Sequence, residues 1–455
     1  MRKSRGVRRM LCLLPLLASC WSTLSTVALS GNCSLPIHTG VRIDGYDIGA
    51  KRAATSPAAC CELCSREPRC KAFCWVNTAT CWLKTGASPP HTSEGCVSGY
   101  TNIIPGPPPK PPSPAPPPLA PVSAMATALE YVGPAVSEPS WTVWGATPVV
   151  DDTGRVHLFV ARWAGAGVTP GWYTTSELAR YTASSPEGPF TFAEVVLRGT
   201  GVPGAWDCFS PSNPEVQRFG DTYALFYIAN NDTRRPPFPL NQQVGLVTGP
   251  SPAGPWKKAG QDGLILGNNV PGHFSEGHQI VNPTAIEIGG RFYVYFKSGY
   301  FENKTTVFGL ATADALDGPY TMLPEPVLVA PRGAQTVFED AQVFKSNGTI
   351  FIVTTDNFGT LTGVPAGLAL WRSQDGVQFS PGEVELAMYL FPRYVPRYDP
   401  SIIKRVYGGA PSPQRPKILM HQGRPSHLYV ASGWVYDGTT RCESHVFRIG
   451  MNVTL

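Results

Sequence analysis

The stretch that decides the fold runs from Val337 to Asp356 and reads VFEDAQVFKSNGTIFIVTTD. Two runs of alternating apolar residues flank an Asn-Gly pair at residues 347 and 348. Alternation with a period of two around such a turn is typical of a β-hairpin. Because Glu339, Asp340 and Asp356 stand at its open end, the stretch predicts two antiparallel strands with carboxylates gathered at one end.

Four further segments repeat this frame: GATPVVDDTGRVHLFVARW from Gly145, SNPEVQRFGDTYALFYIAN from Ser212, VNPTAIEIGGRFYVYFKSG from Val281 and QRPKILMHQGRPSHLYVASG from Gln414. If the copies are aligned on Pro148, Pro214, Pro283, Ala341 and Pro416, the steps between them are 66, 69, 58 and 75 residues. Such steps leave room for four strands per repeat. Sheets without helical periodicity between them bury their faces by radial repetition. The repeats therefore predict an all-β fold, a five-bladed β-propeller.

The first thirty residues resemble a secretory leader, with five basic residues ahead of an apolar run over 11–21. Small residues at 28 and 30 suit cleavage before Gly31. The alternative is an uncleaved signal anchor in a Golgi or other secretory-pathway membrane, but the run lacks an 18-residue apolar core. A signal peptide over 1–30 predicts a secreted protein, extracellular or in a cell wall, with no membrane insertion after cleavage.

Removal of the leader takes the formal net charge from +5 to 0, because its five basic residues have no acidic partners. Nucleic acids and anionic membranes bind clusters of uncompensated Lys and Arg. A nucleic-acid partner is therefore not expected. Five sequons instead predict N-glycosylation, at Asn32, Asn231, Asn303, Asn347 and Asn452.

Cysteine usage divides the chain, since eight of the twelve cysteines fall between residues 33 and 96. They are Cys33, Cys60, Cys61, Cys64, Cys70, Cys74, Cys81 and Cys96. In an exported chain this density predicts a small disulfide-rich α+β module over 31–101, with one amphipathic helix over 56–67. Zinc binding is the rival interpretation, and the irregular spacing disfavours it. Outside the module, Cys208 and Cys442 either pair or remain as two buried thiols.

A Pro-rich stretch over 105–121 separates this module from the repeats and predicts a polyproline II spacer. The expected domains are thus the module, a linker over 102–137 and a propeller over 138–455.

The strands of a propeller converge on a central channel, so the leading ends of the five hairpins should form one ring. By the proline alignment this ring holds Thr147, Asn213, Asn282, Asp340 and Arg415. Across the same rim, at the ends of the second strands, stand Arg162, Asn230, Lys297 or Ser298, Asp356 and Ser432. These polar groups suit hydroxyl recognition, and flat aromatic faces such as Trp144 suit a sugar ring.

The order PAACCELCSREPRCKAF, TCWLKTG and VSGY over 33–100 resembles the PAN/apple family. That resemblance implies a helix pinned to a small sheet, and a module that binds a protein or glycan partner. By analogy Cys64 pairs with Cys70, Cys33 with Cys96, and Cys60 or Cys61 with Cys81, whereas Cys74 fits no pair.

The repeats NPTAIEIGGRFYVYF, FEDAQVF and RPKILMHQGRPSHLYVASG resemble the five-bladed glycosidases of family 43 and their relatives in families 32, 62, 68, 117 and 130. Well-studied members carry an Asp, an Asp and a Glu in blades one to three, where this chain has Thr147, Asn213 and Asn282. Glycoside cleavage needs two carboxyls. The candidate catalytic residues are therefore Asp340, Glu177, Asp207 and Glu339. The candidate substrate-binding residues are Trp144, Arg162, Asn213, Asn282, Asp356 and Arg415.

These resemblances imply a secreted glycoside-hydrolase-like protein that acts on an extracellular polysaccharide or glycan, with the apple-like module as a targeting arm and no metal or cofactor. Because the usual triad is missing, a non-catalytic carbohydrate-binding or adhesion protein is the alternative. Acids at blade rims also pair with Arg for structural reasons, and Asp340 with Arg162 or Arg415 would be such a pair. Of the two adjacent acids, strand alternation predicts that Asp340 rather than Glu339 faces the channel.

Overall fold

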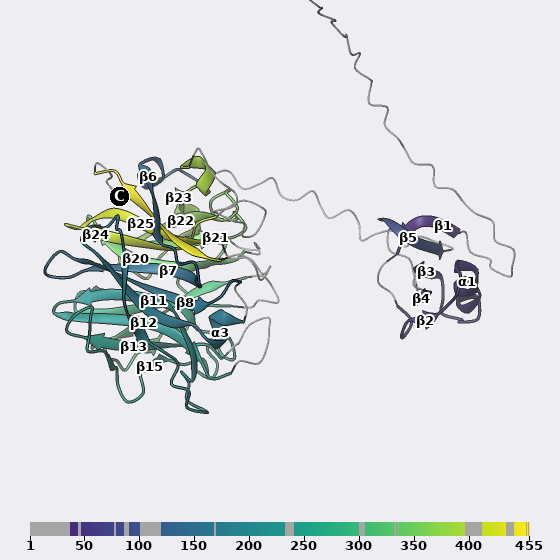
Figure 1. Ribbon diagram of the computed structural model, residues 1–455, viewed down its shortest axis with the longest axis horizontal. Coiled ribbons are helices and arrows are strands. Elements are labelled where there is room, and N and C mark those ends of the chain that lie inside the picture. The colour runs from purple at the N-terminus through teal and green to yellow at the C-terminus, as the bar shows by residue number, and fades with distance from the viewer. Residues whose placement is uncertain are drawn as a thin grey trace, which may run out of the picture. The chain divides into compact units, whose positions relative to one another are not determined.

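The computed structural model describes residues 37–43, 47–76, 79–85, 91–100, 120–167, 170–232, 241–299, 305–331, 334, 336–395, 412–433, 441–451, 453 and 455. The predicted leader, most of the Pro-rich stretch, Asn32, Cys33, Asn303 and Asn452 lie outside these residues. The protein divides into two compact units, residues 1–115 and 116–455 (Figure 1).

The N-terminal unit is a five-stranded antiparallel sheet with one helix. Its strands follow the order β1 (Ile37–Arg42), β5 (His91–Tyr100), β3 (Ala72–Val76), β4 (Thr80–Lys84) and β2 (Arg52–Ala53). Helix α1 (Pro57–Ser65) begins at Ser56, whose side chain accepts a hydrogen bond from the Ala59 amide, and proline occupies its first turn. Both features favour a helix start.

Disulfides hold α1 to the sheet, as the cysteine density predicted. Cys60 pairs with Cys81 and Cys64 with Cys70, which confirms two of the predicted pairings, and Cys61 is also disulfide-bonded. Cys74 is a buried free thiol on β3. The predicted Cys33–Cys96 pair involves a residue outside the described ranges and stays a prediction.

The C-terminal unit contains five antiparallel sheets, each numbered as a blade and given from its first hairpin strand outward. Blade I holds β7 (Trp141–Val150), β8 (Val156–Ala164), β9 (Glu177–Ala183) and β10 (Thr191–Leu197). Blade II holds β11 (Phe209–Phe219), β12 (Thr222–Asn230) and β13 (Gln243–Gly249), flanked by β14 (Lys257–Lys258) and β15 (Leu264–Leu266). Blade III holds β16 (Val281–Ile288), β17 (Arg291–Ser298), β18 (Val307–Ala313) and β19 (Thr321–Met322). Blade IV holds β20 (Phe338–Ser346), β21 (Thr349–Asp356), β22 (Gly367–Ser373) and β23 (Glu385–Met388). Blade V holds β24 (Gln414–His421), β25 (Arg424–Ser432), β26 (Glu443–Ile449) and β6 (Leu129–Val136). The short helices of this unit are α2 (Ala124–Thr127), α3 (Gly171–Thr174), η1 (Pro381–Glu383) and η2 (Phe391–Arg393).

These blades close into a ring, because each of the strands β7, β11, β16, β20 and β24 contacts the corresponding strand of the next blade, and β24 contacts β7. A hydrophobic cluster fills each of the five interfaces between neighbouring blades. The five-bladed propeller predicted from the hairpin repeats is therefore confirmed.

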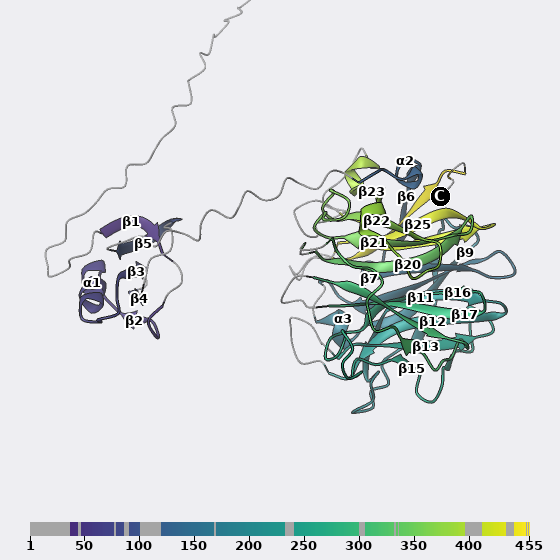
Figure 2. The same cartoon turned by 180° about the vertical axis from the view of Figure 1, so that it is seen from behind.

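An N-terminal strand completes the last blade. Strand β6 pairs with β26 and lies beside the yellow C-terminal strands in Figure 1. The segment before it bridges to blade IV, where Val122 pairs with Leu386 and α2 packs against β23 (Figure 2). The linker predicted over 102–137 therefore extends too far toward the C-terminus, since β6 belongs to blade V. Gly133 and Pro134 interrupt the alternation of β6, and this is why the sequence did not indicate a strand there.

Two further expectations concern single side chains of the propeller. Asn347 is exposed at the turn between β20 and β21, and Asn231 is exposed after β12, so both acceptor side chains are accessible. Of the two alternatives left open for Cys208 and Cys442, the pairing does not occur, because Cys208 is a buried free thiol.

Candidate functional site

The first strand of every blade carries a bulge at the same place, next to a residue with positive φ. The register of pairing shifts at this point in all five blades. The positive-φ residues form a set that we call the first ring: Gly145, Asn213, Asn282, Asp340 and Arg415. Glycine and asparagine adopt this conformation most readily.

This register corrects the prediction for blade I. The proline alignment places Thr147 with Asn213 because Pro148 mimics the proline of the other repeats, but the bulge places Gly145 there. Thr147 belongs two positions further on, in a second ring with Glu215, Thr284, Gln342 and Lys417.

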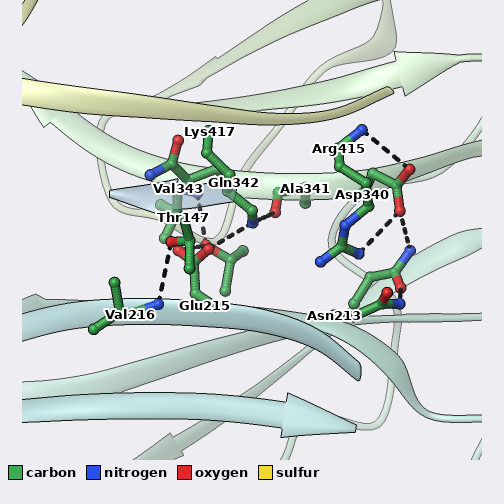
Figure 3. Close-up of polar contacts among 12 residues, drawn as sticks. Thr147, Asn213, Glu215, Val216, Asp340, Ala341, Gln342, Val343, Arg415 and Lys417 are labelled. Carbon is green, nitrogen blue, oxygen red and sulfur yellow. Dashed lines mark hydrogen bonds and ion pairs between the residues drawn. The ribbon is translucent and has the colours of Figure 1, made fainter. Parts of the chain in front are cut away.

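A continuous chain of hydrogen bonds joins four members of the first ring (Figure 3). The Asn213 amide donates to Asn282 Oδ1 at 2.6 Å, and Asn282 Nδ2 donates to Asp340 Oδ1 at 2.8 Å. Arg415 donates to the same carboxylate twice, from Nη1 to Oδ1 at 3.1 Å and from its backbone amide to Oδ2 at 3.3 Å. The Arg415 side chain runs past Gly145, where an added Cβ would lie 3.5 Å from Nε. Sequence register thus brought together the right four side chains.

Asp340 and Glu339 occupy different surroundings although they are adjacent. Asp340 takes its place in the first ring, whereas Glu339 accepts hydrogen bonds from Lys297 Nζ at 2.5 Å and from Asn357 Nδ2 at 2.7 Å. The left-handed φ of Asp340, +63°, interrupts the strand alternation on which the prediction for these two acids rests.

The two carboxyls also differ in their acidity. Burial raises the pKa of Asp340, Arg415 opposes this and the Glu339 carboxylate adds to it, and the net pKa lies above its ordinary value. Burial acts in the same direction on Glu339, but the Lys297 ammonium and the hydrogen bonds from Lys297 and Asn357 outweigh it and lower the pKa. Two neighbouring carboxyls whose pKa values diverge are a known arrangement in acid–base sites.

The second ring lies one layer deeper and was missed by sequence reasoning. Lys417 Nζ lies 2.5 Å from Glu215 Oε2, and the two side chains are 1% and 0% exposed. Other members bond to the first strand of the next blade: Thr147 Oγ1 accepts from the Val216 amide at 3.2 Å. Each member is a polar residue inside an apolar run, and that was the signal that the sequence offered. The second ring ties the blades together (Figure 3).

Glu177 and Asp207 lie elsewhere and are held by cations. Glu177 binds Arg162 Nε and Arg198 Nη2, each at 3.0 Å, and Asp207 Oδ2 lies 2.6 Å from Lys258 Nζ. Within the described residues neither carboxylate hydrogen-bonds to the first ring. Both carboxylates therefore form ion pairs within their own blades, Glu177 in blade I and Asp207 in blade II.

The remaining predicted residues are also engaged in packing. Arg162 is enclosed by the rings of Trp141 and Phe192, at 4.2 and 4.3 Å from its guanidinium carbon. Trp144 is buried in the hydrophobic cluster between blades I and II. Asp356 Oδ2 accepts hydrogen bonds from the Leu361 and Thr362 amides and so anchors the loop after β21; its pKa is raised by burial.

Among the described residues, no group of three or more His, Cys, Asp or Glu side chains is placed to hold a metal ion. None of the helices described is long and apolar enough to cross a membrane.

Comparison with known proteins gives one family match and several structural ones. The PAN domain family matches residues 41–84, and no curated protein matches the chain. Zg3597, a family 117 glycoside hydrolase produced by the marine bacterium Zobellia galactanivorans, is 14% identical with a TM-score of 0.52, over 72% of this protein and 91% of its own length. A structure described as a glycoside hydrolase is 15% identical with a TM-score of 0.52, over 70% of this protein and 91% of its own length. At such identities the likeness concerns the fold. The protein therefore combines a module that matches the PAN domain family with a five-bladed β-propeller whose fold is similar to that of these glycoside hydrolases.

Proposed function

We propose that this protein is a glycosidase that acts on an extracellular polysaccharide or glycan, bound at the first-ring end of the propeller channel. The observation that carries the proposal is the pair Glu339 and Asp340, two carboxyls of diverging pKa set beside the amides of Asn213 and Asn282. Glycoside cleavage needs two carboxyls in different protonation states. The glycoside hydrolases that share the fold support this choice.

The rest of the protein fits an extracellular role. The leader over 1–30 would deliver the protein to the secretory pathway, where the cysteines of the PAN module oxidise and the sequons are glycosylated. The PAN module would then act as a targeting arm that binds a protein or a glycan near the substrate.

A second candidate function is carbohydrate binding without cleavage. It is favoured because every predicted catalytic acid is matched by a cation: Asp340 by Arg415, Glu339 by Lys297, Glu177 by Arg162 and Asp207 by Lys258. A carboxylate that is fully paired in the resting protein serves architecture as readily as chemistry.

One experiment separates the two functions. The full-length secreted protein is incubated with a panel of plant, algal and bacterial polysaccharides, and released sugar is measured beside binding to a glycan array. The glycosidase is expected to release sugar and to lose that activity in Glu339→Gln or Asp340→Asn. Asp152→Asn is the matched control, because Asp152 is an exposed acid paired with Arg218 in blades I and II. Retention on the array without release would establish the binding protein. If the protein neither releases sugar nor binds to the array, both functions are rejected.

A further inference from the structure

The two adjacent acids differ in how much of each carboxylate is left for a ligand. Asp340 receives three hydrogen bonds, from Asn282 and twice from Arg415, and only 6% of its side chain is exposed. Glu339 receives one hydrogen bond on each oxygen, and 21% of its side chain is exposed. An ionised carboxylate offers about four acceptor positions. Glu339 therefore keeps free acceptor positions on its accessible carboxylate.

Two elements fix the orientation of Glu339. Lys297 comes from β17 of blade III, and Asn357 follows β21 of blade IV, so the carboxylate is held from both sides of one blade interface. Side chains that react must be held by such supporting hydrogen bonds if they are to keep one productive geometry.

The charge at this position is not needed for the fold. The positions equivalent to Glu339 in the other blades are Trp144, Ser212, Val281 and Gln414. Those equivalent to Lys297 are Ala161, Ile228, Thr355 and Ala431. Blades I, II and V thus pack with uncharged residues at both places, and the ion pair is peculiar to the interface of blades III and IV.

We propose that Glu339 is the carboxylate that contacts the substrate directly, that Lys297 and Asn357 are its positioning residues, and that Asp340, the second carboxyl of the pair, is held within the first ring. This assignment rests on the proposed function as a glycosidase. It reverses the order of importance expected from strand alternation, because access and free acceptor positions favour Glu339.

The test uses the full-length protein and a substrate from the polysaccharide panel. Glu339→Gln is expected to lower kcat by about 10²- to 10⁴-fold, the usual contribution of a group in acid–base catalysis. Glu339→Ala should regain activity with added azide or formate, because a small anion can occupy the vacated carboxylate position. A purely structural carboxylate would give no such rescue.

Lys297→Met provides a second readout. Since Lys297 lowers the pKa of Glu339, its removal should shift the acid limb of the kcat/KM profile to higher pH. Asn357→Leu should shift the limb in the same direction, and Asp152→Asn should leave the profile in place. If Glu339→Gln unfolds, the double variant Glu339→Gln with Lys297→Met removes both charges and is used in its stead.

The outcomes distinguish this inference from the proposed function. Wild-type protein that releases sugar while Glu339→Gln remains active would overturn the assignment of Glu339 alone. An unmoved acid limb in Lys297→Met would overturn the positioning role of Lys297. If the wild-type protein releases no sugar from any substrate, the proposed glycosidase function is rejected, and the assignment of Glu339 is rejected with it.

Discussion

Glu215→Gln tests whether the second ring holds the propeller together. Glu215 is fully buried and lies 2.5 Å from the buried Lys417, and it also accepts hydrogen bonds from Thr284 Oγ1 at 3.0 Å and Gln217 Nε2 at 2.9 Å. Glutamine keeps the shape and an acceptor oxygen but removes the charge. Lys417 would then retain the Ala341 carbonyl, at 2.9 Å, without a carboxylate to balance its ammonium.

The expected cost is large because burial already lowers the pKa of Lys417, and Glu215 is what opposes that effect. Removal of one partner from a buried ion pair costs about 3–5 kcal/mol. The propeller unit spans residues 116–455, and an unfolding entropy of about 2.1 cal/mol/K per residue gives roughly 0.7 kcal/mol/K for it. The melting temperature should therefore fall by about 4–7 °C.

The measurement is calorimetric or circular-dichroism melting of the secreted protein, with urea unfolding as a second determination of the free energy. Glu215→Gln combined with Lys417→Met removes both charges and should recover most of the loss, since a neutral pair leaves no buried charge uncompensated. A single variant within about 0.5 kcal/mol of wild type would refute the reasoning, because surface changes have effects of that size. So would a double variant as unstable as the single one.

Further predictions concern closure, pH and thiols. Deletion of residues 116–136 removes α2 and β6 and should give insoluble protein, because the edge of β26 is then exposed. Deletion of residues 1–115 should leave a soluble unit with one cooperative unfolding transition. A soluble product of the first deletion would argue against closure by β6. Burial lowers the pKa of His445 to about 4, so the stability that neutral His445 contributes is complete above its unfolded pKa and is lost as pH falls from about 6.5 to about 4. The loss is about 3 kcal/mol, and His445→Gln should flatten this part of the urea-unfolding profile, whereas an unchanged slope would contradict it. The pKa of Asp340 is raised, so its ionisation costs stability as pH rises above its unfolded pKa. Asp340→Asn should therefore gain stability relative to wild type over that pH range. A difference in the free energy of unfolding between variant and wild type that does not change with pH would be inconsistent with the burial argument. Iodoacetamide should label Cys74 only after denaturation, and mass spectrometry that finds label on the native protein would show that the thiol is accessible.

The amino-acid sequence by itself determined the fold, and the reason is the locality of its signals. A β-hairpin is specified by residues within about twenty positions of one another, such as those around Asn347, so five hairpins could be recognised and counted. The same locality explains the helix at Ser56 and the Cys64–Cys70 disulfide, whose cysteines lie six residues apart. The register of blades II to V was equally local, and it placed Asn213, Asn282 and Asp340 in one ring.

Interactions between distant segments were decided only by the tertiary structure. Gly145 occupies the first ring because β7 bulges there, so that residues 145 and 146 lie opposite a single residue of β8. The proline of blade I had instead pointed to Thr147. Strand β6 carries Gly133 and Pro134, which hide its alternation, and it gains its hydrogen bonds from β26, more than 300 residues away.

The same distinction applies to the charges of the site. No local pattern says which cation faces which acid, so the pairing of Glu177 with Arg162, of Asp207 with Lys258 and of Glu339 with Lys297 had to come from the packing of the blades. Whether a carboxylate is accessible or enclosed depends on these neighbours, because each ion pair or hydrogen bond occupies an acceptor position that a substrate would otherwise use. The sequence could list the acids at the channel, and only the closed ring of blades could separate Glu339 from Asp340.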